Sequence, residues 1–198
     1  MITSVEKVLS IPRSILDKVC PHSFNYNTTE AREAFKGNTE FIPRNLVETD
    51  FTRKQIIPYV LAKCGDKYLC IQRTSKQTES RLHNKYGLGV GGHINDEDQS
   101  PDKDIIDAGM RRELNEEIQF PDEVSCKLVG IINDDTLEVD RVHTGFVYVL
   151  ESSTETFDLQ EKDQHRPSWK TVAELTELEP LMESWAKVVF DNVIKAKA

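Results

Sequence analysis

The sequence predicts an α+β protein, an α/β/α sandwich in which a mixed β-sheet lies between helices. Segments rich in strand-forming residues occur in two groups, and an amphipathic helical pattern follows each group. The chain has 198 residues, which is more than one typical domain of about 150 and is enough to bury a core. We expect an N-terminal extension over residues 1–50, packed on a main domain over residues 51–198.

The composition excludes several classes of protein. Hydrophobic residues make up 38% and charged residues 30% of the chain, and the mean hydropathy is −0.50, as in soluble globular proteins. The formal net charge of −9 repels phosphate backbones, so we expect no nucleic-acid polymer as a partner. No apolar run approaches the roughly 20 residues of a membrane span, and no signal-peptide core is present. We therefore expect a cytoplasmic protein that contacts no membrane and has four free thiols.

The first 50 residues are expected to contain two short helices, over residues 14–19 and 28–35, the second ended by Gly37. Four aromatic residues are spread through this extension: Phe24, Tyr26, Phe35 and Phe41. Their apolar surface favours burial against the main domain. Two further roles stay open for the extension, a part that overhangs a pocket and a contact in a homodimer.

The main domain is expected to begin with a β-hairpin, whose strands over residues 56–62 and 68–72 flank a turn at Gly65. A polar loop over residues 75–84 leads to residues 86–94, where four of nine residues are glycine and permit close approach of the backbone to a ligand. We expect Gly91 and Gly92 to end a strand. The remaining expected elements are a helix from Ser100 or Pro101 to about residue 117, strands over residues 127–133 and 141–150, a short element over residues 169–175 and an amphipathic helix over residues 180–194.

The central helix carries the most informative pattern. Its apolar residues form one stripe: Ile106, Met110, Leu114 and Ile118. At about 100° per residue, Glu117 lies only about 40° from the centre of this stripe and Glu113 about 80°. Glu113, Glu116 and Glu117 share one side of the helix, where their mutual repulsion requires compensation by cations. Arg112 supplies one positive charge, and a hard divalent cation would supply two through oxygen ligands.

Gly91-Gly92, a loop and then Arg112-Glu113-Leu114-Asn115-Glu116-Glu117 resemble the Nudix box of the MutT-like hydrolases. That box is written G-x5-E-x7-R-E-U-x-E-E-x-G-U, in which U is an apolar residue. The similarity extends from about residue 57 to about residue 185, and it includes the hairpin that ends at Arg73. The resemblance implies the Nudix fold, here with an N-terminal extension.

The chain departs from the box at three points. Eight residues before Arg112 the box has a glutamate, and this chain has Asp104. The longer distance between the glycines and Asp104 implies an inserted loop over residues 95–103. The closing glycine of the box is absent, because Gln119 and Phe120 follow Ile118. Asp104 keeps a carboxylate with a shorter reach and is a candidate outer-sphere contact to a metal.

By position, the resemblance implies Mg²⁺ or Mn²⁺ as the cofactor. Glu113, Glu116 and Glu117 would be its ligands, with the backbone carbonyl of Gly92 as a further one. Arg112 would orient a glutamate through a charge-assisted hydrogen bond, so the expected catalytic residues are Glu113, Glu116 and Arg112. The implied reaction is attack of water on a diphosphate that is linked to another moiety.

Other residues are candidates because of their place in the chain. The general base is expected to be a box glutamate or an acid on a later loop, namely one of Asp134, Asp135 and Glu138. Arg73 and Lys85 flank the glycine-rich segment and are candidate phosphate contacts in the substrate site. His93 directly follows Gly92 and is a candidate for the lining of that site.

The sequence thus favours a metal-dependent hydrolase that cleaves a diphosphate linkage in a nucleoside diphosphate derivative or a related small phosphorylated molecule. Two alternatives share the implied fold. One is a binding or regulatory module without turnover, against which the intact R-E-L-x-E-E argues. The other is an isomerase of the isopentenyl-diphosphate type, whose chemistry relies on a pocket cysteine and a set of histidine ligands. The sequence does not single out such a set among its five histidines.

Overall fold

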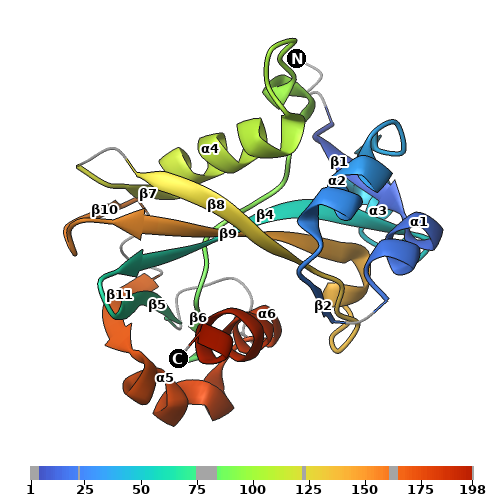
Figure 1. Ribbon diagram of the computed structural model, residues 1–198. Helices are drawn as coiled ribbons and strands as arrows, with labels where there is room; N and C mark the ends of the chain where they lie inside the picture. Colours follow the sequence, from blue (N-terminus) through green and yellow to red (C-terminus); the bar gives the residue numbers. More distant parts are fainter. Residues whose placement is uncertain (1–4, 22, 75–83, 122–123, 161–164, 198) are drawn as a thin grey trace. The chain divides into compact units, whose positions relative to one another are not determined.

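The computed structural model describes residues 5–21, 23–74, 84–121, 124–160 and 165–197. The expected polar loop falls almost entirely on residues 75–83, which lie outside these ranges. The chain combines a mixed sheet with helices, so the expected α+β class is confirmed (Figure 1). It divides into two compact units, each assembled from separate stretches of sequence. Within the described ranges, no helix has the length and apolar character needed to cross a membrane.

The first unit comprises Met1–Tyr59, Gly91–Glu113 and Val129–Val147. Its N-terminal part contains β1 (Lys7–Pro12), α1 (Arg13–Val19), β2 (Phe24–Asn25), α2 (Thr28–Phe35), β3 (Glu40–Pro43) and α3 (Arg44–Val47). The two expected helices are confirmed as α1 and α2, which pack on each other (Figure 1). Strand β1 lies antiparallel between β3 and the beginning of β4 (Arg53–Cys64).

Two aromatic residues of the extension pack inside this unit. The ring of Phe35 meets that of Phe146 edge-on at a centroid distance of 5.0 Å. Phe24 lies against Gly130, where an added Cβ would stand 2.0 Å from its ring. The expected burial of Tyr26 is wrong: it is 59% exposed, and its ring makes an edge-to-face contact with that of Phe24 at a centroid distance of 4.9 Å. The domain boundary at residue 50 stays a prediction. If residues 1–50 pack on the main domain, their deletion should lower the thermal stability of the protein.

The remaining elements of the first unit include the beginning of α4 (Ile105–Glu117) and the parts of β8 (Ser125–Ile132) and β9 (His143–Ser152) nearest residues 133–142. The expected start of the central helix at Ser100 or Pro101 is wrong. Asp104 caps α4 instead, because its Oδ1 accepts hydrogen bonds from the backbone N–H groups of Ile106 at 3.0 Å and Asp107 at 3.3 Å. Residues 100–103 form a turn before this cap.

The second unit comprises Val60–Val90, Leu114–Leu128 and Tyr148–Ala198. Its further elements are β5 (Lys67–Arg73), β6 (Tyr86–Gly87), β7 (Ile118–Gln119), β10 (Asp158–Leu159), β11 (His165–Thr171), α5 (Val172–Leu178) and α6 (Ser184–Val189). The expected hairpin is confirmed, with Gly65 at a φ of 59° in its turn. The expected C-terminal helix is divided into α6 and a π-helical turn, Phe190–Ile194.

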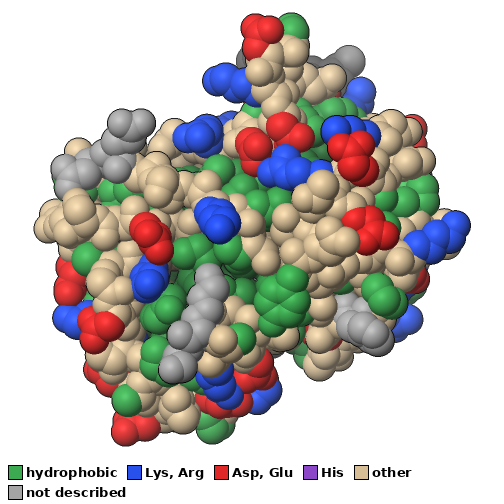
Figure 2. Space-filling view, in the orientation of Figure 1, with side chains coloured by type: hydrophobic (Ala, Val, Ile, Leu, Met, Phe, Trp, Pro, Cys, Tyr) green, Lys and Arg blue, Asp and Glu red, His purple; other side chains and the backbone are tan. Residues whose placement is uncertain are grey.

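In the larger sheet of the described residues, the strand order is β11-β5-β4-β9-β8-β2, with β1 joined to β4 and β3 to β1. Strands β4, β8 and β9 contribute residues to both units. Acidic and basic side chains are interspersed over the face seen in Figure 2, in keeping with an acidic but mixed surface. All four cysteines are free, as expected, with Cys20 and Cys70 buried.

Candidate active site

Helix α4 presents its glutamates as the helical wheel predicts. The four stripe residues, three in α4 and the fourth directly after it at the start of β7, are buried with exposures of 6% or less: Ile106, Met110, Leu114 and Ile118. Glu113 and Glu117 are half-buried at the border of the stripe, and Glu116 is exposed. The last turn of this one helix therefore carries three carboxylates on neighbouring positions.

Arg112 is bound on several sides. Its Nε and Nη2 donate to the two carboxylate oxygens of Asp98 at 2.7 and 2.9 Å, a bidentate pair. Nη1 donates to Oε1 of Glu113 at 2.8 Å, and Nη2 also donates to the backbone carbonyl of His93 at 2.8 Å. The hydrogen bond with Asp98 is the largest cause of a raised Arg112 pKa, so the guanidinium stays charged. Arg112 thereby fixes Glu113 relative to residues 93 and 98.

Asp98 occupies the acidic position of the box by both spacing and contact. Five residues separate it from Gly92, as in the motif, and its side chain is 4% exposed. Counted from Gly92, the extra residues fall between Asp98 and Arg112, and the expected inserted loop over residues 95–103 stays a prediction. Counting forward from Gly92 instead of backward from Arg112 would have found Asp98. Asp104 lies at the start of α4 and pairs with Arg32 at 2.8 Å, so its outer-sphere metal role stays a prediction.

Both box glycines are closely packed, Gly91 against backbone and Gly92 against the end of a side chain. A Cβ on Gly91 would stand 1.8 Å from the carbonyl oxygen of Pro58, and one on Gly92 would stand 2.4 Å from Oε2 of Glu113. The backbone at Gly92 thus lies directly against the Glu113 carboxylate, whose other oxygen binds Arg112. The expected strand before Gly91 is reduced to a single antiparallel bridge at Val90.

His93 and His143 form a pair in the first unit. Their Nε2 atoms are 3.4 Å apart, and Nδ1 of His143 donates to the carbonyl of Val139 at 2.7 Å. Burial is the largest cause that lowers the pKa of His93 to about 3, and the charge of Arg44 adds to it. Burial also lowers the pKa of His143. No local pattern indicates a role for His143, because it lies 50 residues from His93.

Arg73 and Lys85 belong to the second unit, where Arg73 is engaged by other side chains. Its Nε donates to Oε1 of Glu183 at 2.7 Å, and its Nη1 donates to Nε2 of His165 at 2.7 Å. The backbone N–H of Arg73 donates to the carbonyl of Lys85 at 2.9 Å. The phosphate contacts expected for Arg73 and Lys85 stay predictions.

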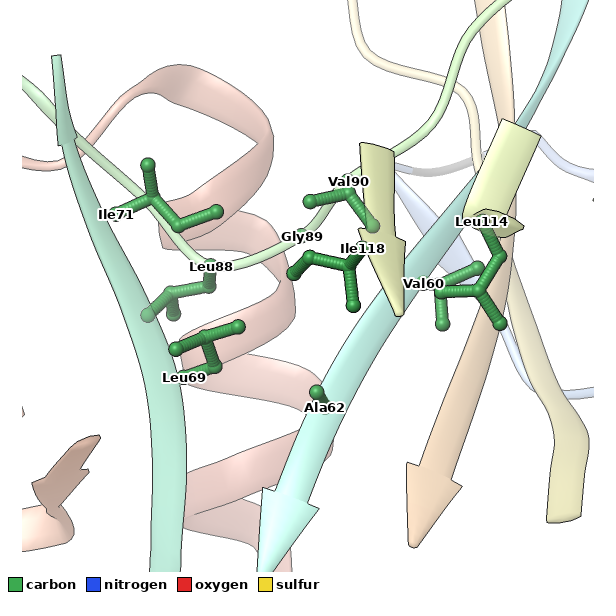
Figure 3. Close-up of a pocket in the computed structure, with 9 residues that line it drawn as sticks. All are labelled: Val60, Ala62, Leu69, Ile71, Leu88, Gly89, Val90, Leu114 and Ile118. Atoms are coloured by element: carbon green, nitrogen blue, oxygen red, sulfur yellow. The ribbon is translucent and has the colours of Figure 1, made fainter. Parts of the chain in front are cut away.

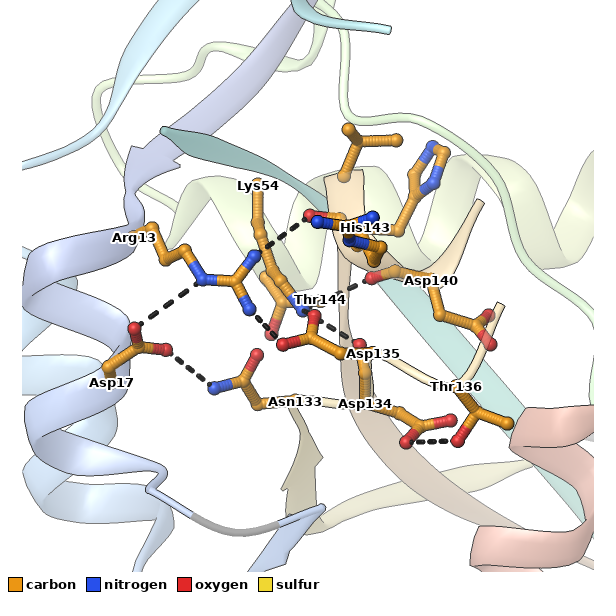
Figure 4. A network of polar contacts seen from close by, with 12 residues as sticks. Arg13, Asp17, Lys54, Asn133, Asp134, Asp135, Thr136, Asp140, His143 and Thr144 are labelled. Carbon is orange, nitrogen blue, oxygen red and sulfur yellow. Dashed lines mark hydrogen bonds and ion pairs between the residues drawn. The ribbon is translucent and has the colours of Figure 1, made fainter. Parts of the chain in front are cut away.

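Three residues of the later loop, Asp134, Asp135 and Asp140, contact a buried lysine (Figure 4). Nζ of the fully buried Lys54 donates to the carbonyl of Asp134 at 2.8 Å, to Oδ1 of Asp135 at 2.9 Å and to the carbonyl of Asp140 at 3.1 Å. Arg13 also pairs with Asp135. Desolvation lowers the pKa of Lys54, yet each of its three protons has an acceptor. The network fixes this loop, and a role as general base stays a prediction for its three acids: Asp134, Asp135 and Glu138.

A closed apolar pocket lies in the second unit (Figure 3). Nine residues line it: Val60, Ala62, Leu69, Ile71, Leu88, Gly89, Val90, Leu114 and Ile118. Their side chains carry no polar atom, so none of these side chains can donate a hydrogen bond to a phosphate. It belongs to the hydrophobic core of the unit.

The donor atoms at the end of α4 fit a hard divalent cation, since carboxylate oxygens are ligands that Mg²⁺ and Mn²⁺ prefer. Among the residues that the structure describes, no three His, Cys, Asp or Glu side chains are already gathered around a common point for an ion. Glu113 is the candidate ligand that Arg112 holds in place.

Comparisons with known proteins identify the family. A scan of protein-family models found no match. The chain is 35% identical over 166 residues to protein YmaB of Bacillus subtilis (strain 168), which covers 81% of this chain and 77% of YmaB. It superposes on the crystal structure of Tm1382, described as a proposed Nudix hydrolase, with a TM-score of 0.81 and 29% identity over 96% of this chain and 100% of the other. The chain belongs to the Nudix hydrolase family, enzymes that act on phosphorus-containing acid anhydrides.

A more distant structure shares the fold. It is a bifunctional NMN adenylyltransferase/ADP ribose pyrophosphatase from Francisella tularensis, in complex with AMP and a manganese ion. The two chains are 14% identical with a TM-score of 0.50, over 73% of this chain and 42% of the other. Similarity at this level shows the Nudix fold alone.

Proposed function

We propose that the protein is a divalent-metal-dependent pyrophosphohydrolase, which uses water to cleave the diphosphate linkage of a nucleoside diphosphate derivative. The observation that carries this proposal is the cluster in which Arg112 binds Asp98 and orients Glu113 against the backbone of Gly92. A hydrolase of phosphate anhydrides needs carboxylates that are fixed in this way. A mobile carboxylate would have to be oriented in each catalytic cycle, which costs entropy.

Glu113, Glu116 and Glu117, with the carbonyl of Gly92, would hold Mg²⁺ or Mn²⁺. One guanidinium faces two carboxylates in the cluster of Arg112, so the cluster is negative even before the next helical turn is counted. Such an excess of carboxylate favours a bound cation. When bound, the cation would polarise phosphoryl oxygens and lower the pKa of its water. Arg112 would keep Glu113 in its ligating orientation throughout the reaction.

A box glutamate is the favoured general base. Asp135 is bound by Lys54 and Arg13, and Asp134 accepts from the hydroxyl of Thr136, so both loop acids already serve the local network. Glu116 is exposed at the end of α4, where a water molecule can reach it. Glu113 and Glu116, with Arg112 as the positioning group, are therefore the proposed catalytic set.

The proposed substrate is a small nucleoside diphosphate derivative, with ADP-ribose as the first compound to test. Support comes from the Francisella structure, which is named as an ADP ribose pyrophosphatase and contains AMP and manganese. The net charge of −9 disfavours a polymeric phosphate. His93, whose carbonyl binds Arg112, is the proposed contact on the substrate side. A cytoplasmic location and a homodimer stay predictions.

The isomerase alternative finds little support in the buried cysteines. Burial raises the pKa of Cys20 to about 11 and that of Cys70 to about 12, so both thiols are poor nucleophiles at neutral pH. A binding module without turnover is the alternative that experiment must separate from the hydrolase.

The test is a panel of nucleoside diphosphate derivatives, incubated with the protein and either Mg²⁺ or Mn²⁺, and read by phosphate release after a coupled phosphatase step. The proposal expects hydrolysis of at least one derivative, and loss of that activity in EDTA. Tight binding of a derivative without any product would identify the binding module instead.

A further inference from the structure

We propose that His93 and His143 form a second metal site, which takes a transition-metal ion such as Zn²⁺, Co²⁺ or Ni²⁺ through their Nε2 atoms. The proposal goes beyond the proposed function, which assigns a hard cation to the carboxylates of α4. Imidazole nitrogen is the ligand type that these softer ions prefer, whereas Mg²⁺ prefers oxygen.

The distance between the two rings fits joint ligation better than a hydrogen bond. The Nε2 atoms are 3.4 Å apart, and the ring centroids are 5.5 Å apart, so the nitrogen tips point toward each other. Hydrogen bonds from N–H groups are strongest at about 2.7–3.2 Å. Two imidazole nitrogens at 2.0–2.1 Å from one tetrahedral ion are about 3.3–3.4 Å apart. An ion can therefore bind both rings with little change in their separation.

A ring contact holds His143, and a backbone contact holds His93. Nδ1 of His143 donates to the carbonyl of Val139 at 2.7 Å, which places its proton on Nδ1 and leaves the Nε2 lone pair toward His93. Such a carbonyl partner behind the ring is typical of histidines that ligate metals. The backbone of His93 is fixed because its carbonyl accepts from Nη2 of Arg112 at 2.8 Å.

Two imidazoles do not complete the coordination shell of an ion, so its remaining ligands would come from solution. The positive charge of Arg44 acts on both rings and opposes a dication, while Glu48 acts on His143 with the opposite sign. Two protein ligands occupy half of a tetrahedral shell, and the other positions would take water or oxygen atoms of an anion, which Arg44 favours. We therefore expect weaker binding than at a zinc site with four protein ligands.

The experiment is a Zn²⁺ titration of the full, metal-stripped chain in excess Mg²⁺, followed by the ¹⁵N chemical shifts of the imidazole nitrogens. Excess Mg²⁺ occupies hard-cation sites, so the Zn²⁺ response reports nitrogen ligands. The proposal expects the Nε2 signals of His93 and His143 to shift together and to saturate near one equivalent. His93→Gln and His143→Gln should each weaken Zn²⁺ binding at least tenfold, by analogy with the roughly 10–100-fold cost of disturbing a metal's supporting contacts. His165→Gln, at a histidine of the second unit, is the control and should bind Zn²⁺ like the wild type.

Unchanged Nε2 signals of His93 and His143 in the presence of Zn²⁺ would overturn the proposal. So would equal Zn²⁺ affinity in the two variants and the control. The wild-type titration needs no substitution, so a folding defect in a variant leaves the test intact. Failure of diphosphate hydrolysis would contradict the proposed function without changing this nitrogen readout, so the two can fail separately.

Discussion

Two arginine–carboxylate clusters, one in each unit, differ in their balance of charge. Arg112 binds two carboxylates, those of Asp98 and Glu113, so this cluster keeps a net negative charge. Among the described residues, Arg73 pairs with one carboxylate, that of Glu183 at 2.7 Å, and also donates to the ring of His165. A matched pair is complete without a ligand, whereas an excess of half-buried carboxylate favours a cation. The balance of charge, more than the presence of an arginine, therefore distinguishes a candidate metal site from a structural pair.

The largest effect is expected from Asp98→Asn, which keeps the shape of the side chain and removes its charge. Arg112 would lose its bidentate partner, and the unfolding free energy should fall by up to about 3 kcal/mol, reduced because Arg112 is partly exposed. Turnover should fall at least about tenfold, as for other groups that support a metal site. Glu183→Gln is the matched change in the Arg73 cluster, and thermal melts with steady-state rates should show lost stability with a smaller change in turnover. Equal losses of turnover in the two variants would remove the distinction between the clusters.

Metal binding should stabilise the protein through the α4 carboxylates and leave the Arg73 cluster unaffected. With free Mg²⁺ at about 100 times its dissociation constant, the unfolding free energy should rise by roughly 2.7 kcal/mol. Denaturant unfolding with and without Mg²⁺ measures this gain. Glu183→Gln should retain it, and Glu117→Gln should lose most of it. If Glu117→Gln kept the full Mg²⁺-dependent rise in unfolding free energy, the ion would bind at another site.

Asp104→Asn should have a small effect, because asparagine caps helices about as well as aspartate. The variant would lose the ion pair between Arg32 and Asp104, whose side chain is 39% exposed. Such an exposed pair contributes about 0–1 kcal/mol to stability. Turnover should fall less than in Asp98→Asn, which the same rate assay can measure. A loss of turnover as large as that of Asp98→Asn would indicate that Asp104, and not Asp98, is the acidic residue of the box.

The smallest effect concerns the capping box at α5, which lies on the surface of the second unit. The backbone N–H of Thr171 is the largest cause that lowers the pKa of Glu174 from 4.5 to about 2. Because the folded pKa is depressed, the stabilisation is present above about pH 4.5 and is lost as the pH falls toward 2. Urea unfolding should therefore show Glu174→Gln to be less stable than the wild type near pH 6, with the difference shrinking on acidification. Glu177→Gln is the control on the same helix, and a difference independent of pH would contradict the assignment.

The sequence predicted those features that depend on local spacing. The buried stripe of α4 and the side shared by Glu113, Glu116 and Glu117 follow from the period of one helix, and the structure confirms the stripe. Strands β1 and β3 were not predicted, because a short strand is stabilised by partners that are distant in the sequence.

Contacts between segments that are distant in the sequence could not be predicted from local patterns either. His143 meets His93 across 50 residues, and Lys54 meets Asp135 across 81 residues. Asp98 is predictable from the sequence, since its spacing from Gly92 matches the box. The spacing from Arg112 indicates Asp104 instead, because the chain has extra residues between Gly92 and Arg112.

The central claim is that the carboxylates at the end of α4 hold the metal on which hydrolysis depends. The most direct test compares metal-dependent hydrolysis of the best diphosphate substrate by the wild type, Glu116→Gln and Glu117→Gln, with Glu33→Gln on the exposed face of α2 as the control. Each α4 variant removes a ligand charge and keeps the side-chain volume, so we expect a folded protein with turnover reduced at least about tenfold. The control should keep wild-type turnover. Wild-type turnover in Glu117→Gln, or wild-type activity that persists undiminished in EDTA, would contradict the account.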